Sequence, residues 1–361
     1  MEKADILILG TGVFAARILF DLVTVAHEPT TIVIAGRNAE RLAWLGTAAK
    51  ARSAIFGTPI TIVTRQADLL ADDAGAQIIG QSQPTVIVQA ASPQSSSVIA
   101  ATGNRWAAMV ARAGLSLTTV FQAYLSSKLA TATAKASPGS CFINCCYPDV
   151  SNGILHALGL PVTCGVGNVA ILAAVFATSP AAANAHALDV LAHYQTLTPW
   201  RQPPQERHGP APRVWRDGNE VSDVFATFRD IRLTREPVID VSGATGVPMM
   251  LAMAHGKPWH GHVPGPNGLP GGYPVAWRDG ALSVVPPAGL SIADTIAWNA
   301  AFEQRNGVYV DDNGYVHYTG EVRDCLAEES PELAKGFAVT ELFDVHAQMI
   351  SLRDRLETRQ D

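Results

Sequence analysis

The feature that most constrains this chain is a glycine-rich segment directly after its first apolar run. Residues 6–9 (ILIL) predict a buried strand, and a second apolar strand follows at residues 32–35 after an amphipathic stretch. The segment between them opens with Gly10, Thr11, Gly12, Val13 and Phe14. The first glycine permits a tight turn, and the second lets backbone N–H groups approach a pyrophosphate at the helix N-terminus. The pattern therefore predicts a dinucleotide-binding βαβ unit.

The end of the second strand indicates which dinucleotide is bound. Sites for NAD carry an acidic residue there, which holds the ribose 2′-hydroxyl. This chain instead has Gly36, Arg37 and Asn38. An arginine at this point suits a 2′-phosphate, so we expect NADP(H) rather than NAD(H). The alternative is that Arg37 is a solvated loop cation.

Size and composition limit the remaining possibilities. The chain has 361 residues, 48% hydrophobic and 16% charged, with a net charge of −6. This length suggests two domains, and a negative net charge does not favour binding to nucleic acid. The N-terminus lacks a signal-peptide pattern, no apolar run reaches the roughly 18 residues that span a bilayer, and five cysteines make an odd set. We expect a cytoplasmic protein with no membrane or nucleic-acid partner and no disulfide framework.

Two further strand ends are candidate cofactor contacts. Residues 58–70 predict a third strand that ends at Asp68, where such a domain often contacts adenine. Residues 84–92 predict a fourth strand that ends at Ala90, Ala91 and Ser92, where the chain passes under the nicotinamide ribose. Both positions are equally compatible with ordinary turns. Residues 106–121 predict a helix followed by a strand, residues 125–136 a helix, and residues 140–162 a strand, a turn and a helix.

The composition changes after about residue 161. Hairpin signals appear (RDGN, RDGA, DDNG), and a segment rich in proline and glycine interrupts the pattern. We therefore expect an α/β protein in which a Rossmann doubly wound parallel sheet precedes a second α+β domain rich in antiparallel strands. The expected division is 1–160 for dinucleotide binding, 161–332 for substrate binding and dimerisation, and 333–361 for a C-terminal helix that returns to the first domain.

The first 160 residues resemble the saccharopine dehydrogenase-like reductases. GTGVFAARIL is similar to their GAGxVGxxxA opening, AGRNAERL to their second strand and helix, and residues 125–155 to the segment before their substrate domain. The resemblance implies NADP-linked reduction of a C=N or C=O bond, such as an imine formed from an amine and a keto acid. This chain reads YPD where the family has FDPG, so Asp149 follows the proline instead of preceding it.

A second resemblance lies at the same turn. NCCYPD is similar to the GCYPT of the N-acetylglutamyl-phosphate reductases, which implies Cys146 as a nucleophile that forms a thioester reduced by hydride. A thiolate near a helix N-terminus has a lowered pKa, which suits this role. The alternatives are a small buried thiol on a strand and, for the whole chain, a protein that senses NADP without turnover.

Reduction of a carbonyl or imine needs a proton donor and groups that hold the substrate. Tyr147 and Asp149 lie in the turn expected at the carboxyl edge of the sheet, although Asp149 is equally suited to cap the next helix. His208 is a further donor candidate, in a basic loop.

Candidate substrate-binding residues lie in two loops of the second half. In the basic loop, Arg207 and Arg213 suit a carboxylate, or form a solvated face. The proline- and glycine-rich segment adds His260 and Tyr273. No ligand spacing indicates a metal. A homodimer is plausible.

Overall fold

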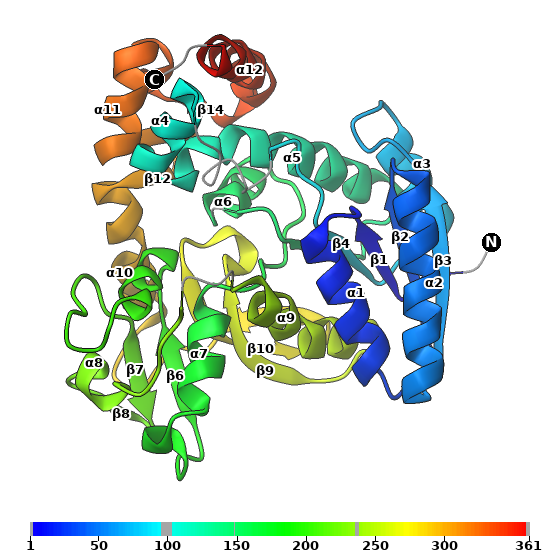
Figure 1. Cartoon of the computed structure of the whole chain (residues 1–361), viewed down its shortest axis with the longest axis horizontal. Helices are drawn as coiled ribbons and strands as arrows, with labels where there is room; N and C mark the ends of the chain where they lie inside the picture. The colour runs from blue at the N-terminus through cyan, green and yellow to red at the C-terminus, as the bar shows by residue number, and fades with distance from the viewer. Residues whose placement is uncertain (1–2, 95–102, 148, 235–237, 359–361) are drawn as a thin grey trace.

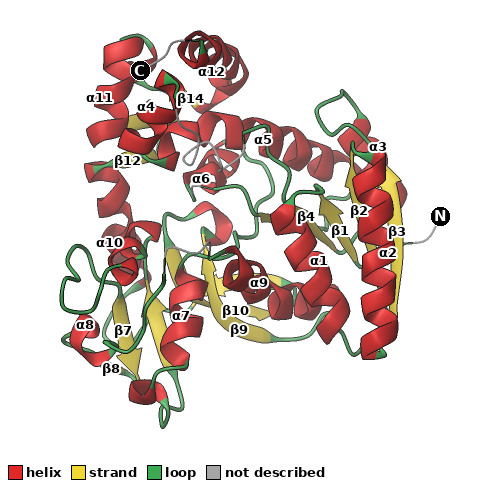
Figure 2. Ribbon diagram, in the orientation of Figure 1, coloured by secondary structure: helices red, strands yellow, loops and turns green. Residues whose placement is uncertain are grey.

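The structure is a computed structural model of the chain and describes residues 3–94, 103–147, 149–234 and 238–358. Its N-terminal half contains one five-stranded parallel sheet, in the order β3-β2-β1-β4-β5. The strands are β1 (Ile6–Leu9), β2 (Thr30–Gly36), β3 (Ile60–Gln66), β4 (Val86–Gln89) and β5 (Cys141–Asn144). Strand β1 is central and fully buried. Figures 1 and 2 show this sheet with helices on either side of it.

Helices cover both faces of the sheet, as the alternation of side chains along β1 requires. Ile6 and Ile8 belong to a hydrophobic cluster with α1 and α2, whereas Leu7 and Leu9 belong to a cluster with α3 and α5. The helices of this half are α1 (Val13–Val25), α2 (Ala39–Phe56), α3 (Ala74–Ser82), α4 (Arg105–Ala113), α5 (Thr119–Ala136) and α6 (Val150–Ala157). The predicted doubly wound α/β arrangement is confirmed.

The described residues of the second half form three antiparallel sheets of three strands each. They are formed by β6 (Leu188–Leu191), β7 (Arg213–Arg216) and β8 (Asn219–Glu220); by β9 (Trp259–Pro264), β10 (Gly272–Arg278) and β11 (Ala281–Val284); and by β12 (Gly307–Val310), β13 (Tyr315–Thr319) and β14 (Phe337–Ala338). Each of the three predicted hairpin signals joins two neighbouring strands. In two of them an aspartate adopts positive φ, Asp217 at 49° and Asp279 at 53°.

This half also contains more helix than its sequence predicts. The helices are α7 (Val169–Ala177), α8 (Val224–Thr227), α9 (Ile239–Ala254), α10 (Ile292–Arg305), α11 (Gly320–Glu329) and α12 (Leu342–Glu357). Helix α12 packs against α4 and α5 (Figure 1), and His346 stacks on Tyr124 with ring centroids 3.7 Å apart. The division of the chain into domains stays a prediction. In the part of the chain described, no helix is both long and apolar enough to cross a membrane.

The strand predicted at the end of residues 106–121 is wrong. Residues Leu115–Thr118 form a short 3₁₀ helix that leads directly into α5. The run of leucine, threonine and valine favours a strand locally. Here Leu117, Val120 and Phe121 are buried in the cluster that also contains α4 and α12, so tertiary packing overrides the local preference.

Helix α9 is absent from the sequence-based expectation because it contains Gly243, Gly246 and Pro248. Glycine and proline normally interrupt helices. In this fold α9 lies directly against α1 (Figure 1), and a Cβ at Gly243 would lie 3.2 Å from the Cβ of Arg17. The glycine thus allows the second half of the chain to pack closely against the first helix.

We predict that Gly243→Val lowers the free energy of unfolding by about 1 to 3 kcal/mol, because the added carbons enter the contact between α9 and α1. Chemical denaturation of the purified protein measures this change. Gly139→Val is the matched control, since a Cβ at Gly139 would have no atom within 4 Å; we expect a change of about 0.5 kcal/mol or less. Equal destabilisation by both variants would contradict the packing described.

Candidate active site

The glycine-rich turn leaves the N-terminus of α1 open. Gly10 adopts φ of 123°, and a Cβ there would lie 2.9 Å from the backbone of Ala90, so only glycine fits. Gly12 occupies the N-cap position, where no side chain caps the helix and an added Cβ would have no atom within 4 Å. Val13, the first residue of α1, is 62% exposed, and Phe14 packs at the edge of the core. The turn therefore offers backbone N–H groups and space for an anion.

The side of this turn is formed by the end of β2. A Cβ at Gly36 would lie 2.7 Å from the Cγ2 of Thr11, so the glycine lets the two segments touch. Arg37 is exposed, and Asn38 accepts a hydrogen bond from the Arg41 backbone N–H at 2.9 Å as the N-cap of α2. Arg41 Nε donates to the carbonyl of Thr11 at 3.2 Å. Arg41 is a second cation beside the turn.

The two other predicted cofactor contacts have internal partners. Asp68 accepts a hydrogen bond from the backbone N–H of Leu70 at 3.1 Å, which makes it a turn residue. The carbonyl of Ala91 accepts from Gln89 Nε2 at 2.8 Å, and Ser92 Oγ donates to the carbonyl of Gln94 at 2.7 Å. Ala90 borders Gly10 and is half-buried. Ala90 and Ala91 thus border the glycine turn and Ser92 follows them, whereas Asp68 follows β3, the strand at the edge of the sheet.

Cys146 lies at the same edge of the sheet and is buried. Its Sγ is 3.2 Å from the carbonyl of Ala91 and 3.7 Å from Gln89 Nε2. Burial raises the pKa of Cys146 to about 11. The thiol form is favoured, which is the opposite of what a nucleophilic cysteine requires.

The turn after β5 brings Asp149 into the interior. Asn144, the last residue of β5, accepts from the backbone N–H of Cys146 at 3.2 Å and donates to Asn152 at 2.8 Å, which fixes the turn. Asp149 is 5% exposed and occupies the N-cap position of α6, but its side chain does not cap the helix. It accepts a hydrogen bond from Asn168 Nδ2 at 2.6 Å.

Two further titratable residues are buried beside Asp149. His193 is fully buried, and its Nε2 lies 3.5 Å from Oε1 of Glu303, which is 2% exposed. Burial raises the pKa of Glu303 to about 8 and that of Asp149 to about 7, and it lowers the pKa of His193 to about 4. At neutral pH the histidine is therefore uncharged and Glu303 mostly holds its proton.

The tautomer of His193 follows from its other ring nitrogen. Its Nδ1 accepts a hydrogen bond from the backbone N–H of Gln195 at 3.4 Å, which leaves the proton of the neutral ring on Nε2, toward Glu303. Phe302 stacks on the imidazole, with centroids 4.8 Å apart, and holds the ring plane.

Three tyrosines surround this group. Burial raises the pKa of Tyr147, Tyr194 and Tyr273, and nearby carboxylates raise it further: Asp149 acts on all three, and Glu303 on Tyr194 and Tyr273. Tyr194 shares a hydrogen bond with Ser116 at 2.7 Å, and Tyr273 donates to the carbonyl of Pro270 at 2.5 Å.

Four polar atoms of this region have no hydrogen-bond partner among the described residues, although each is buried. They are Asp149 Oδ2, His193 Nε2, Glu303 Oε1 and Asn299 Oδ1. Asn299 lies four residues before Glu303 on α10, so the two side chains share one helix face. An unpaired buried polar atom costs roughly 1 to 3 kcal/mol. We name these four residues the buried polar cluster.

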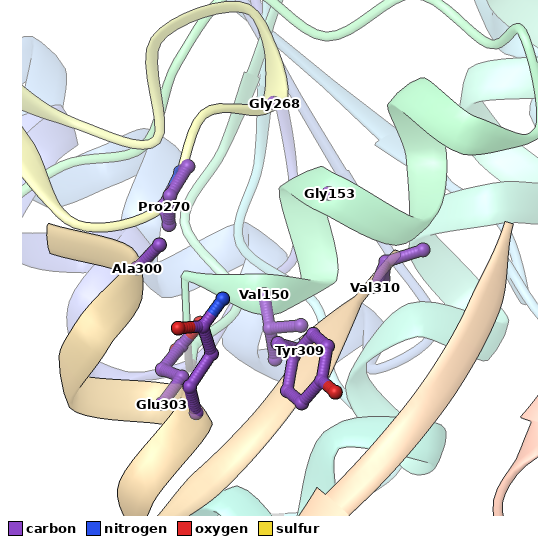
Figure 3. Close-up of a pocket in the computed structure, with 9 residues that line it drawn as sticks. Val150, Gly153, Gly268, Pro270, Ala300, Glu303, Tyr309 and Val310 are labelled. Carbon is purple, nitrogen blue, oxygen red and sulfur yellow. The ribbon is translucent and has the colours of Figure 1, made fainter. Parts of the chain in front are cut away.

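A cavity of about 100 Å³ reaches this cluster at Glu303. Figure 3 shows Glu303 with Val150, Pro270 and Tyr309 around the cavity. Val150 directly follows Asp149, and Ala300, which also lines the cavity, directly follows Asn299. The cavity therefore borders Glu303 on the side of α10, whereas Asp149, His193 and Asn299 do not line it.

The structure does not bring the basic loop to this site. Arg207 lies over the Trp200 ring at 4.3 Å and donates to the carbonyl of Ile231 at 2.6 Å. Arg213 forms a bidentate pair with Glu220 at 2.6 and 2.8 Å. His208 is exposed, and so is His260 on β9. These side chains are engaged elsewhere or face solvent, so the predicted carboxylate clamp is not assembled in this conformation.

Of the residues predicted for chemistry, Tyr147, Asp149 and Tyr273 do lie together. His193, Asn299, Glu303 and Arg41 are absent from the sequence-based set. A signal for two of them exists, because Thr295, Asn299 and Glu303 repeat every four residues on the buried face of an amphipathic helix. His193 has no such signal. Among the described residues no group of three histidine, cysteine or acidic side chains is arranged to hold a metal ion.

With this geometry in view, the first half of the chain has a Rossmann-type α/β fold. No family model matches its sequence, and no curated protein matches it either.

The structural similarity is to malate and lactate dehydrogenases. A Plasmodium falciparum malate dehydrogenase in complex with NADH is matched with a TM-score of 0.53 over 96% of this chain and 100% of that one, at 11% identity. A Cryptosporidium parvum malate dehydrogenase gives 0.52 over 84% and 96%, at 15% identity. An Eimeria maxima lactate dehydrogenase with NADH and oxamate gives 0.51 over 83% and 92%, at 11% identity.

These comparisons support the Rossmann fold that the sequence-based resemblance implies. They do not show membership of the saccharopine dehydrogenase-like family. The turn that carried that resemblance, around Tyr147 and Asp149, is built here around a buried polar cluster; Pro148 lies outside the described residues.

We predict that the stability of the protein falls with rising pH because of Glu303. A carboxyl whose folded-state pKa is about 8 binds its proton more tightly when folded, so its contribution is complete below the ordinary value of 4.5 and is lost as pH rises toward 8. Glu303→Gln removes this titration. As the pH rises from 6 to 9, the unfolding free energy of the variant minus that of the wild type should increase by about 1 to 3 kcal/mol. Glu206→Gln, at an exposed glutamate, is the control. If the difference in unfolding free energy between Glu303→Gln and the wild type did not change with pH, the raised pKa of Glu303 would be contradicted.

Proposed function

We propose that this protein is an NADP(H)-dependent oxidoreductase that reduces the C=N bond of an imine, formed from an amine and a keto acid, or the C=O bond of a small carboxylate-bearing metabolite. The observation that carries the proposal is the open N-terminus of α1 at Gly12, next to the strand ends that lead to the buried polar cluster. Because β1, β4 and β5 are adjacent and parallel, their carboxyl ends meet at one edge of the sheet.

The residues present fit a dinucleotide. The space at Gly12 and the uncapped N–H groups of α1 suit a pyrophosphate, and Ala90, Ala91 and Ser92 lie beside that turn. When bound, a reduced nicotinamide supplies the hydride that such a reaction needs.

The preference for NADP(H) rests on the end of β2. Positions 36–38 hold no acidic residue, Arg37 is exposed, and Arg41 lies against the Thr11 carbonyl. Two cations beside the ribose position suit a 2′-phosphate. Glu40, exposed in the first turn of α2, is the nearest acidic competitor in sequence.

Proton transfer is assigned to the buried polar cluster. Reduction of a C=N bond adds hydride to carbon and a proton to nitrogen, and the donor works best when its pKa is near the working pH. Asp149 and Glu303 have pKa values of about 7 and 8, so both hold protons near neutral pH. His193 Nε2 lies 3.5 Å from Glu303 Oε1, with no hydrogen bond between them.

We predict that Arg37→Ala weakens NADPH binding at least tenfold, about 1.4 kcal/mol, and leaves NADH binding unchanged. The reason is loss of the exposed cation that would meet the 2′-phosphate. Titration of the purified protein, followed by nicotinamide fluorescence, measures both affinities. Arg229→Ala, another exposed arginine, is the control. Equal affinity of the wild type for NADPH and NADH would remove the assigned role of Arg37.

We predict that Asp149→Asn and Glu303→Gln each lower the rate of NADPH oxidation with amine and keto-acid pairs by about 100-fold or more. Cys146→Ala should keep most of the activity, because burial holds its thiol protonated. The opposite pattern, activity abolished by Cys146→Ala or by a thiol alkylator, would favour the cysteine-dependent acyl or semialdehyde reductase. NADPH binding without oxidation by any substrate pair would favour a sensor.

A further inference from the structure

The backbone is strained at Asn168, where the chain passes beside the buried polar cluster. Its φ is 47° and its ψ is −109°. These angles lie outside the left-handed helical region, where ψ is about +30 to +60° and where asparagine is tolerated. Asn267, another asparagine at positive φ, has ψ of 29° and fits that region. A conformation like that of Asn168 costs stability and persists only where the surrounding structure imposes it.

The neighbours of Asn168 on either side are tightly packed. Gly167 precedes it with φ of 93°, and a Cβ at Gly167 would clash with the Ser242 side chain of α9. Val169 follows it and is fully buried, and a Cβ at Gly272 of β10 would clash with the Val169 side chain. Packing against α9 and β10 therefore holds Asn168 in its strained conformation.

The side chain of Asn168 contacts Asp149 instead of capping its own helix. Asn168 occupies the N-cap position of α7, where asparagine is among the best capping residues. Its side chain nevertheless makes no capping hydrogen bond. Instead, Nδ2 donates to Oδ1 of Asp149 at 2.6 Å. The chain thus accepts both a strained backbone and a helix without a side-chain cap at the residue that holds Asp149.

This hydrogen bond determines which oxygen of Asp149 holds the proton. An amide N–H donates best to the carbonyl oxygen of a neutral carboxyl group, so Oδ1 is the acceptor and the proton lies on Oδ2. Oδ2 has no hydrogen-bond partner among the described residues. Once the proton has left, the same N–H stabilises the carboxylate. Burial raises the pKa of Asp149 to about 7, and the hydrogen bond from Asn168 acts in the opposite direction.

The other titratable groups around Asp149 offer its carboxylate little stabilisation. Burial lowers the pKa of His193 to about 4, so the ring is uncharged near neutral pH, and it raises the pKa of Glu303 to about 8. Burial also raises the pKa of the three surrounding tyrosines, which therefore keep their protons. They are Tyr147, Tyr194 and Tyr273. Within the described part of the chain, the donor that reaches this carboxyl group is Asn168.

We propose that Asn168 is a positioning residue for Asp149: it directs the proton of this carboxyl group to Oδ2 and stabilises the carboxylate that remains after proton transfer. The proposal rests on the proposed function, in which Asp149 supplies a proton to the substrate. In that step the Oδ2–H bond breaks, the proton goes to the imine nitrogen or the carbonyl oxygen, and the electron pair stays on Asp149. Asn168 acts only through Asp149.

NMR of the full-length protein labelled with ¹³C and ¹⁵N tests this interaction directly. In the wild type, we expect one side-chain amide proton of Asn168 to move downfield with the same pH midpoint as the carboxyl carbon of Asp149. Asn168→Gly removes the donor and suits the positive φ, and it should raise the Asp149 midpoint by about half a pH unit or more. Asn267→Gly is the matched control, because Asn267 donates to the carbonyl of Leu282 at 3.0 Å, and it should leave the midpoint unchanged.

The pH profile of NADPH oxidation measures the same interaction during turnover. Because Asp149 must hold its proton to donate it, the rate falls as the pH rises through its pKa. Asn168→Gly should move this fall to higher pH, and Asn267→Gly should not.

The wild-type titration decides the question even where Asn168→Gly does not fold. Amide protons of Asn168 that do not follow Asp149 would overturn the proposal. An Asp149 midpoint that stays the same in a folded Asn168→Gly variant would also overturn it, and any loss of stability would then show a purely structural role. If the Asn168 and Asp149 titrations coincide but the wild type oxidises NADPH with no amine and keto-acid pair, the proposed function fails and the interaction of Asn168 with Asp149 stands.

Discussion

The close approach of Gly10 to the backbone of Ala90 is the contact on which the rest of the site depends. Because no side chain separates β1 from the end of β4, the chain turns at once and starts α1 three residues later. The helix N-terminus is thereby held over the carboxyl ends of the central strands with its N–H groups free of side-chain caps. A Cβ at Gly10, only 2.9 Å from that backbone, would push the helix away from this edge.

The same edge carries the second determinant of the site, at the end of β5. The Asn144 side chain fixes the turn that sends Asp149 inward, where it meets His193 and Glu303 from the second half of the chain. Burying these groups without complete hydrogen bonding costs stability. A cluster of unpaired, titratable side chains is difficult to explain as packing alone, and it supplies proton-holding groups with pKa values near 7 and 8.

The sequence predicted the first half of the fold better than the second. A fully buried β1 and the requirement for glycine at position 10 are local properties that periodicity and turn chemistry express directly. Helix α9 was missed because Gly243 serves a contact with α1, which no local pattern shows. The strand expected near Val120 was wrong because burial against α4 and α12 decided the conformation. Asp149 was identified from its turn, whereas His193 and Glu303 meet it only through tertiary structure, and Arg207 and Arg213 found partners nearby.

The central claim is that the Gly10–Phe14 turn holds a dinucleotide whose reactive end lies toward the buried polar cluster. A crystal structure of the protein grown with NADP⁺ tests it most directly. The account predicts the pyrophosphate against the N-terminus of α1, the 2′-phosphate beside Arg37, and the nicotinamide near Ala91 on the side of Asp149. A dinucleotide bound elsewhere, or one at α1 with its nicotinamide directed away from Asp149, would contradict the account.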